Sequence, residues 1–505
     1  MPLARFPNPM MHLPTGRARL WLFSPQEWWS YVLLTGTFAV TRWLYWQEGI
    51  RYDARPLSYY FQYLDVALLR ARLLESLLHM HGQPPLFNLF LGFVVKCCEA
   101  KQEAVFHWLY MGMGLGVSLL VYALAREVGV SRGLSFGLAL GYQVNPSSVL
   151  YENVLVYAAP VAFLGAASAY FLSRGLSRRA GRQIFVGLLL LAVLVGIRSS
   201  FHLLFYTAAV GYLLLAAPVP IRRQIVLAAI VPFLVAASFF LKNGMLYGRF
   251  ASSTWLGMNL WRVTAQALDP HLRQELVAGG HMELSDRHTF LPLEGYPEKY
   301  WRTIVETCAG PPVLCNINKS EGGTNFNHAA YLAISDALLR DDLYAVQHDP
   351  GVVARRILSG TVHYLWPGST FLGVQENLTK IAAWVDAWDR FIFLRLSVPG
   401  RQDMPDWSRL VYPGMAAWFI AGLGWGLLGF LRASFAMGRV KPDPRLAIVG
   451  LIGYLVMYGF VVGNLFEYGE NMRYRFETAA LSVVLFGHLL SVAGDKARGW
   501  LWRDG

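Results

Sequence analysis

Charged residues are scarce in this chain. Only 15% of its 505 residues are charged, whereas 55% are hydrophobic, and a soluble protein of this length carries about a quarter charged residues. Apolar runs of roughly 17–22 residues recur along the whole sequence, which is the length that a helix needs to cross a bilayer. The shortage of charge therefore excludes an ordinary soluble protein and predicts a polytopic membrane protein.

Acidic residues are also few. The 32 aspartates and glutamates are outnumbered by 44 lysines and arginines, so that the net charge is +12. The basic residues lie mostly in short loops between apolar runs, for example in 174–182 and 432–445. This distribution follows the positive-inside rule, and we therefore expect no nucleic-acid partner. No cleavable signal peptide is expected, because no small-residue cleavage site follows the first apolar run.

Cysteine is rare as well, with four in the chain. Cys97 and Cys98 lie in an apolar segment, where we expect unreactive thiols. Cys308 and Cys315 bracket the letters AGPPVL in a long polar loop. A disulfide between them is expected if this loop faces an oxidising compartment, and two unpaired thiols are the alternative.

The sequence predicts an all-α fold with about ten transmembrane helices, within a range of about 9–13. The positive-inside rule places the N-terminus and the basic loops inside. We divide the chain into an N-terminal transmembrane module (1–241), a large extracytoplasmic loop region (242–409) and C-terminal transmembrane helices (410–505). The expected spans lie near 30–46, 105–125, 133–147, 153–173, 184–200, 201–217, 224–241, 410–431, 446–463 and 477–493.

Two long segments, 47–104 and 242–409, then lie outside. Each contains amphipathic stretches that are shorter than a span, which is typical of helices that lie on the membrane surface. A further hairpin of spans within 351–398 is the alternative. The amphipathic stretches are 57–78, 85–97, 351–366 and 380–396.

Polar residues collect at four places on the predicted outer side. Charges so close to a bilayer are costly, which makes them functional candidates. The first place is RYDARPLSYYFQYLD, at 51–65. Asp53 or Asp65 could serve there as a general base that removes a proton from an acceptor hydroxyl. A hydrated loop acid, or a carboxylate paired with a neighbouring arginine, is the alternative.

The second place is HMHGQPPLFNLFLGF, at 79–93. Pro84 and Pro85 end one helix and begin another, and this break holds His81 and Gln83 on a fixed corner. A plain turn is the alternative. No metal site is expected from the two histidines of this motif, because residues two apart do not share a helix face.

The third and fourth places lie at the outer ends of predicted spans. Glu152 and Asn153 stand in NPSSVLYENVLVYAAP, where an interfacial polar cap is the alternative. Arg473 and Arg475 stand in EYGENMRYRFE. Arginine makes forked bonds to phosphate oxygens, so a lipid phosphate is the expected partner. The alternative is a pair of interfacial anchors, which the positive-inside rule places on the other side.

In this order the four motifs resemble the GT-C superfamily of integral-membrane glycosyltransferases. The resemblance is strongest to the branch, related to glycosyltransferase family 39, that holds protein O-mannosyltransferases and lipid A aminoarabinose transferases. In layout it covers most of the chain. It implies a sugar donor linked to polyprenyl phosphate, and transfer on the periplasmic side of a bacterial inner membrane. The general base then maps to Asp53 or Asp65, and the donor phosphate to Arg473 and Arg475, with Arg198 as a further candidate.

This sequence departs from the family pattern at two points. Asp53 and Asp65 are each followed by an apolar residue, where family members often carry an acidic pair. Glu152 stands where aspartate is usual. The implied inverting transfer requires no cofactor; a divalent metal is possible, although no ligand cluster is evident. The acceptor stays open between a glycan, a lipid and a protein. A lipid-linked glycan ligase or polymerase, and a lipid-linked sugar transporter or flippase, are the alternative functions.

Overall fold

The computed structural model describes residues 25–397, 410–435 and 444–501, and almost all regular structure in these ranges is helical. Strands in the described ranges are limited to β1 (Leu396–Ser397) and β2 (Leu410–Val411), which form an antiparallel pair. The all-α fold class expected from the sequence is therefore present.

A helix lies at each expected span. By length and composition, five helical segments of the described chain can cross a membrane: Glu99–Glu127, Val219–Tyr247, Pro413–Phe435, Pro444–Leu465 and Asn471–Arg498. The chain is thus compatible with an all-α membrane protein, while the number of about ten spans stays a prediction. The helices at the expected spans are α1 (Pro25–Gln47), α6 (Gln102–Glu127), α7 (Arg132–Val144), α9 (Ala158–Arg178), α10 (Gly181–Ile197), α11 (Leu203–Ala216), α12 (Val219–Tyr247), α21 (Pro413–Phe435), α22 (Pro444–Leu465) and α23 (Asn471–Leu501).

Local sequence explains why some of these helices are short. α7 has 13 residues and rises about 20 Å, less than the roughly 30 Å of a hydrocarbon core. Pro146 disfavours helical geometry at Asn145, whose side chain instead caps α8 (Pro146–Glu152) by accepting from the Ser147 N–H at 2.9 Å. α10 ends at Arg198, where the backbone becomes extended.

The remaining helices lie in the two outer segments and cover the stretches where surface helices were expected. The first segment carries α2 (Pro56–Tyr59), α3 (Val66–Ala71), α4 (Leu73–His79) and α5 (Leu86–Cys97). The second segment carries α13 (Leu256–Leu260), α14 (Pro270–Ala278), α15 (Arg302–Thr307), α16 (Pro312–Cys315), α17 (Ala330–His348), α18 (Pro350–Tyr364), α19 (Gln375–Leu378) and α20 (Ala382–Phe391).

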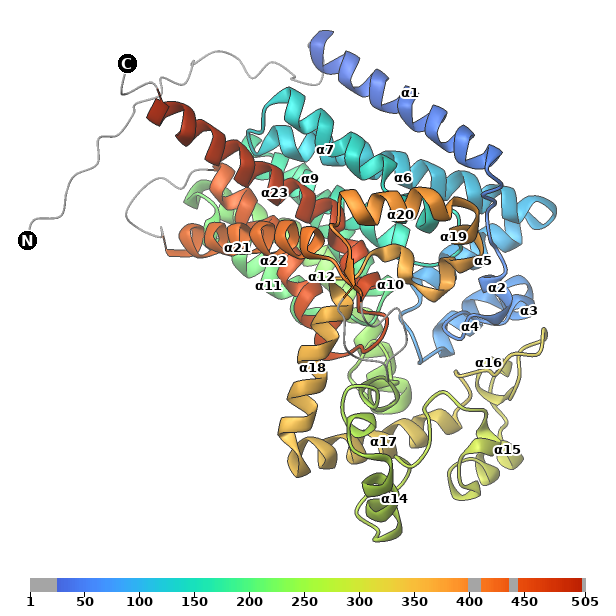
Figure 1. The fold of residues 1–505 in the computed structure, drawn as a ribbon. Coiled ribbons are helices and arrows are strands. Elements are labelled where there is room, and N and C mark those ends of the chain that lie inside the picture. The colour runs from blue at the N-terminus through green and yellow to red at the C-terminus, as the bar shows by residue number, and fades with distance from the viewer. Residues whose placement is uncertain (1–24, 398–409, 436–443, 502–505) are drawn as a thin grey trace, which may run out of the picture.

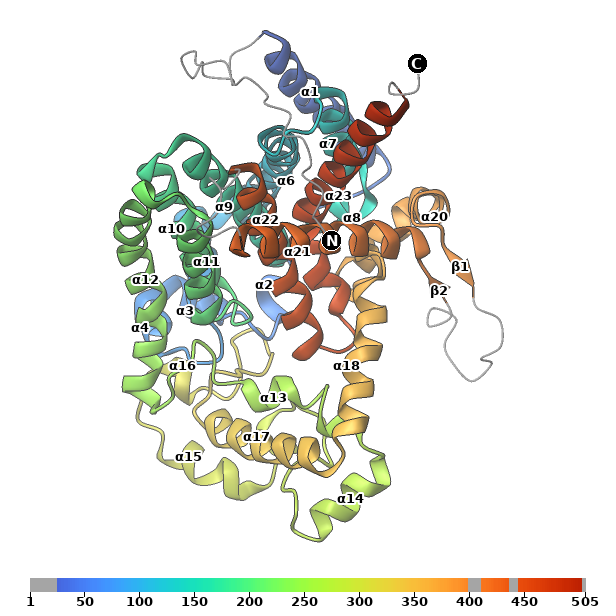
Figure 2. The same cartoon turned by 90° about the vertical axis from the view of Figure 1, so that its left-hand side faces the viewer.

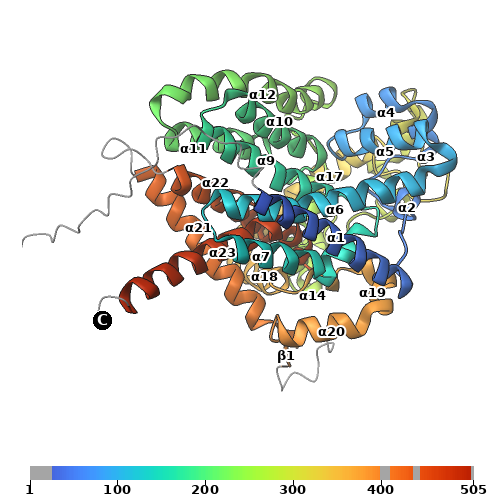
Figure 3. The ribbon, with the colours of Figure 1, turned by 90° about the horizontal axis from the view of Figure 1, so that it is seen from above.

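α14 to α17 of the large outer segment lie at one end of the helical bundle, whereas α20 lies beside the bundle (Figures 1 and 2). In Figure 1, α13 to α17 hang below the bundle, whereas α1 and the C-terminal part of α23 lie at the top. Figure 2 shows α18 running from the bundle down to α17, with α9 to α12 on one side and α21 to α23 beside them. Seen from above, α20 and the α3–α5 group lie at the margins of the bundle (Figure 3).

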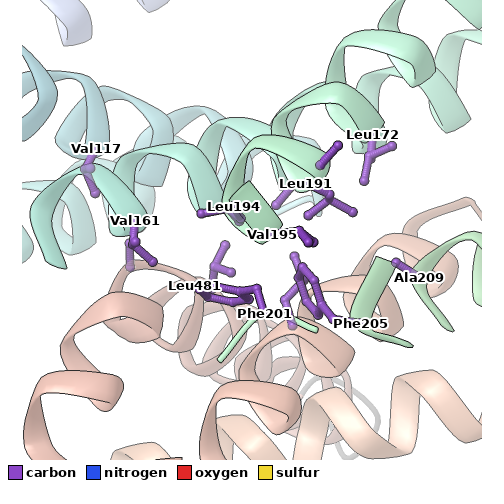
Figure 4. Packing of buried hydrophobic residues seen from close by; sticks show 14 of the residues in the cluster. Val117, Val161, Leu172, Leu191, Leu194, Val195, Phe201, Phe205, Ala209 and Leu481 are labelled. Atoms are coloured by element: carbon purple, nitrogen blue, oxygen red, sulfur yellow. The ribbon is translucent and has the colours of Figure 1, made fainter. Parts of the chain in front are cut away.

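The main hydrophobic cluster joins helices from both halves of the chain (Figure 4). Leu191 of α10, Phe205 of α11 and Leu481 of α23 are all buried in it. α21 and α22 approach so closely that a Cβ on Gly453 would lie 2.5 Å from the backbone of Gly426. Glycine at such crossings allows helices in lipid to pack by direct backbone contact. This packing places the start of α23 beside the end of α10.

The large outer segment has a hydrophobic cluster of its own between α13 and α17. Trp255, Trp261 and Tyr331 are among its buried members. Cys308 and Cys315 are joined by a disulfide, with 5.6 Å between their Cα atoms. The bond closes the short loop between α15 and α16.

The disulfide makes the orientation of the chain testable in intact cells. Cys308 and Cys315 should resist a membrane-impermeant maleimide until an impermeant reductant is added, and should then be labelled from outside. Labelling is located by mass spectrometry of peptides, with Cys97 and Cys98 as internal controls. If the pair is labelled only after the membrane is permeabilised, the orientation is wrong.

Candidate functional site

The first outer loop pairs with the chain that follows α8 in a short parallel β-bridge, between Asp53 and Val154. The Asp53 N–H donates to the Asn153 carbonyl at 2.9 Å, and the Leu155 N–H donates to the Asp53 carbonyl at 2.9 Å. The bridge holds the first outer loop along the segment that follows α8. As a result Tyr60 from the loop and Tyr157 from the segment lie with ring centroids 6.4 Å apart.

Two buried arginines meet at the ring of Tyr157. The guanidinium carbon of Arg198, after α10, lies 4.7 Å from the ring centroid, and that of Arg473, at the start of α23, lies 5.4 Å from it. The Arg198 guanidinium also lies 3.8 Å from the centroid of Tyr474. Each arginine is only 4% exposed. Cation–π contacts stabilise both charges where water is largely excluded.

Each guanidinium is only partly hydrogen-bonded. Arg198 pairs with Glu477, and Arg473 pairs with Glu470 at 3.2 Å. The Arg473 Nη1 also donates to the Tyr60 hydroxyl at 2.7 Å. In the described part of the chain, the Arg198 Nη2 and the Arg473 Nε have no hydrogen-bond partner.

Unpartnered N–H groups on buried cations are costly, and such groups need an explanation when they occur together. Two of them beside one aromatic ring form a donor set for the oxygens of an anion. Glu477 and Glu470 balance the charges of the two arginines. The Glu470 side chain is 29% exposed, so it can turn toward water when an anion binds. We call Arg198, Arg473 and Tyr157 the arginine pair site.

Asp53 lies in the first outer loop, at its β-bridge with Val154. Its carboxylate accepts from the Arg55 Nε at 2.9 Å and from the Arg55 Nη2 at 2.9 Å. The Arg55 side chain is 65% exposed and also pairs with Glu376. The Asp53 Oδ1 also accepts from the Arg55 backbone N–H at 3.0 Å. Movement of the Arg55 side chain into water therefore releases the other oxygen, Oδ2, for another role.

Asp65 has a different environment. Its carboxylate caps α3 by accepting from the Ala67 N–H at 2.9 Å, and it accepts from both the N–H and the hydroxyl of Ser320. Next to it, the Lys319 ammonium donates to the Tyr60 carbonyl at 2.9 Å, and burial lowers the pKa of Lys319 to about 8. Asp65 therefore fastens the 319–320 turn against the wall that carries Tyr60.

His81 is a buried connection between the proline corner and the large outer segment. Its Nε2 lies 2.9 Å from the Asn327 carbonyl and its Nδ1 lies 2.6 Å from the Thr254 hydroxyl. Because a carbonyl only accepts, Nε2 carries the hydrogen and Nδ1 accepts. Burial lowers the pKa of His81 to about 3, so the ring is neutral. A Cβ on Gly82 would overlap Trp255, which explains the glycine at this corner.

The other residues proposed from the sequence take varied positions. The Gln83 amide oxygen accepts from the Ser199 hydroxyl at 3.4 Å, which ties the corner to the turn that follows Arg198. Glu152 is buried in a two-point pair with Arg42 of α1, at 2.8 Å and 2.6 Å. Its role is to anchor α1. The Asn153 side chain donates to the Val149 carbonyl of its own helix.

Arg475 makes its hydrogen bonds outside the arginine pair site. Its Nε donates to the Tyr364 carbonyl at 3.0 Å and its Nη2 to the Trp366 carbonyl at 3.0 Å. Both carbonyls belong to the C-terminal end of α18, where unpaired carbonyls need donors. These contacts give Arg475 a structural role, and the structure brings together Arg198 and Arg473 instead.

Sequence reasoning missed three tyrosines and two partners of the arginines. The tyrosines are Tyr60, Tyr157 and Tyr474, and the partners are Glu470 and Glu477. All three stand inside motifs that were singled out for their charges. An aromatic residue next to a charge that must be buried is the signal that could have found them. Among the described residues, no group of three or more His, Cys, Asp or Glu is placed to hold a metal.

No protein-family model, curated protein or solved structure matches this chain. Its function must therefore be argued from the geometry of the site.

The neutral state of His81 predicts a dependence of stability on pH. The unfolded chain binds a proton at this histidine below about pH 6.5, whereas the folded pKa is about 3. The contribution of neutral His81 to the free energy of unfolding is therefore fully present above about pH 6.5 and falls by about 1.4 kcal/mol per pH unit as the pH decreases toward 3. His81→Gln should flatten this dependence in thermal unfolding of the detergent-solubilised chain between pH 7.5 and 5. His79→Gln is the control, and equal slopes for His81→Gln and the parent chain would contradict the assignment.

Proposed function

We propose that this chain is a membrane glycosyltransferase. It moves a sugar from a polyprenyl-phosphate donor to an acceptor hydroxyl on the extracytoplasmic side of a bacterial cytoplasmic membrane. The observation that carries the proposal is the arginine pair site, in which Arg198 Nη2 and Arg473 Nε are buried donors without a partner among the described residues. Such a site suits a phosphate group, which has oxygens for both donors.

The position of the site favours a phosphate that is attached to a lipid. Arg473 is at the first turn of α23, one of the helices long and apolar enough to cross a membrane. A polyprenyl tail can then lie along the helices in the bilayer while its phosphate reaches the end of the bundle. A water-soluble phosphate would gain nothing from this position.

The reaction needs a base for the acceptor and stabilisation of the leaving group. Asp53 takes the proton from the acceptor hydroxyl, whose oxygen forms the new bond to the anomeric carbon. The bond from that carbon to the phosphate oxygen breaks, and the electron pair leaves with polyprenyl phosphate. Arg198 and Arg473 stabilise the negative charge that develops on this phosphate. The attack from the opposite face inverts the anomeric centre.

Asp53 is preferred to Asp65 as the base because of its partners. Asp53 is held by Arg55, which is mobile enough to release it, since most of the Arg55 side chain is exposed. Asp65 accepts hydrogen bonds from three groups, one of them at a helix N-terminus. Both oxygens of Asp65 are engaged by these groups, so neither is available to an acceptor hydroxyl.

Substitution of either arginine of the arginine pair site should weaken binding of the lipid-linked sugar donor. Arg198→Gln and Arg473→Gln should each weaken the binding of polyprenyl phosphate about tenfold or more, because each removes a charge-assisted bond. Binding is measured by native mass spectrometry of the full chain in nanodiscs. Arg302→Gln, an exposed arginine of the large outer segment, is the matched control. Unchanged binding in both site variants would disprove the phosphate site.

Substitution of Asp53 and substitution of Asp65 should have different effects on sugar transfer and on stability. Asp53→Asn should lower sugar transfer at least about a hundredfold, because the general base is lost, while the thermal midpoint and donor binding stay unchanged. Asp65→Asn should instead lower the thermal midpoint, because it weakens a helix cap and the contact with Ser320. Transfer is assayed with a radiolabelled polyprenyl-phosphate sugar in membranes. Full activity of Asp53→Asn would show that another group is the base.

A further inference from the structure

A cavity lies between the large outer segment and the loop before α23. Its volume is about 330 Å³, at the lower end of the range of about 300–1,000 Å³ that small-molecule sites occupy. Trp261 and Arg262 after α13, Arg356 of α18 and Tyr468 of the loop form its walls. None of these residues belongs to the arginine pair site.

The cavity carries an excess of positive charge. Arg262 Nη1 pairs with Glu467 at 3.2 Å, so its charge is largely balanced. Arg356 has only neutral partners: its Nη2 donates to the Gln266 side chain at 3.1 Å and its Nε to the Arg262 carbonyl at 3.3 Å. Its guanidinium carbon lies 3.3 Å from the centroid of the Tyr468 ring. Among the described residues no carboxylate lies within ion-pair distance of Arg356, and this charge is therefore free to bind an anion.

The rest of the wall suits a ring that bears hydroxyl groups. Trp261 is only 2% exposed and the Arg356 guanidinium covers one face of the Tyr468 ring, so these rings back the wall and the groups that face the cavity are mainly polar. The Trp261 indole Nε1 is buried and has no hydrogen-bond partner in the described chain. Gln266 and His288 add polar groups that can bond to hydroxyls, and the His288 ring lies edge-on to Trp261 with centroids 5.4 Å apart. A guanidinium without a carboxylate partner in the described chain, beside groups that can bond to hydroxyls, fits a sugar that carries an acidic group.

The cavity is connected to the arginine pair site by a short piece of chain. Glu467 and Tyr468, which contact the two cavity arginines, are followed by Glu470 and Arg473 of the other site. The two sites therefore lie at opposite ends of one loop and on the same side of the bundle. A ligand in the cavity would be held next to the place where the donor phosphate binds.

We propose that this cavity binds a sugar that carries a carboxylate, such as a uronic acid unit, and that it is the acceptor subsite of the transferase. The carboxylate pairs with Arg356, and the hydroxyls of the ring bond to Gln266 and His288. Only the acceptor role depends on the proposed function, because binding of the sugar can be measured without any reaction.

The experiment compares two monosaccharides that differ only in the carboxylate. D-glucuronate and D-glucose are titrated into the full chain in nanodiscs, and binding is followed by ligand-observed saturation-transfer NMR. Glucuronate should bind at least about tenfold more tightly than glucose. Arg356→Gln should weaken glucuronate binding about tenfold and leave glucose binding unchanged. Arg355→Gln, the exposed neighbour on the same helix, should bind both sugars like the parent chain.

The possible outcomes are clear-cut. Equal binding of the two sugars, no binding of either, or the same loss in Arg355→Gln and Arg356→Gln would each overturn the proposal. The comparison of the sugars on the unaltered chain stands even if Arg356→Gln fails to fold. Glucuronate binding in a chain that fails to bind polyprenyl phosphate would keep the acidic-sugar site and reject the transferase.

Discussion

The burial of two guanidinium groups beside one tyrosine ring is the constraint on which the outer end of this molecule depends. Arg198 and Arg473 come from helices far apart in the sequence, and both are almost completely buried. Charges in such a place need aromatic faces, carboxylates and hydroxyls around them. Tyr157, Glu477 and Tyr60 supply one group of each kind. Among the described residues, the Arg198 Nη2 and the Arg473 Nε still have no hydrogen-bond partner, and the proposed function rests on these two donors.

Much of the surrounding structure keeps these partners in place. The bridge between Asp53 and Val154 sets the first outer loop against the segment that carries Tyr157. Asp65 fastens the turn whose lysine holds the Tyr60 backbone, and His81 ties the proline corner to the large outer segment. Asp65 and His81 act through position and hydrogen bonding, and neither of them needs to touch the substrate. The polar corner is therefore a structural joint of the site.

The sequence predicted the helical class and the location of the helices because apolar runs, prolines and basic loops report local and membrane constraints directly. It also located the segments that form the site, since charges near a bilayer are unusual. It did not predict which members of each motif would meet. Arg473 and Arg475 are two residues apart and chemically identical, yet only tertiary packing sends Arg475 to the end of α18. The partner of Glu152, Arg42, is likewise distant in sequence and could not be found from spacing.

The central claim is that the arginine pair site holds the phosphate of a lipid-linked donor. The most direct test is a cryo-EM structure of the chain in nanodiscs with bound polyprenyl phosphate. The account predicts phosphate oxygens within hydrogen-bond distance of the Arg198 Nη2 and the Arg473 Nε, with the tail against the apolar helices. A phosphate held elsewhere on the chain, with both of these nitrogens still without a partner, would contradict it.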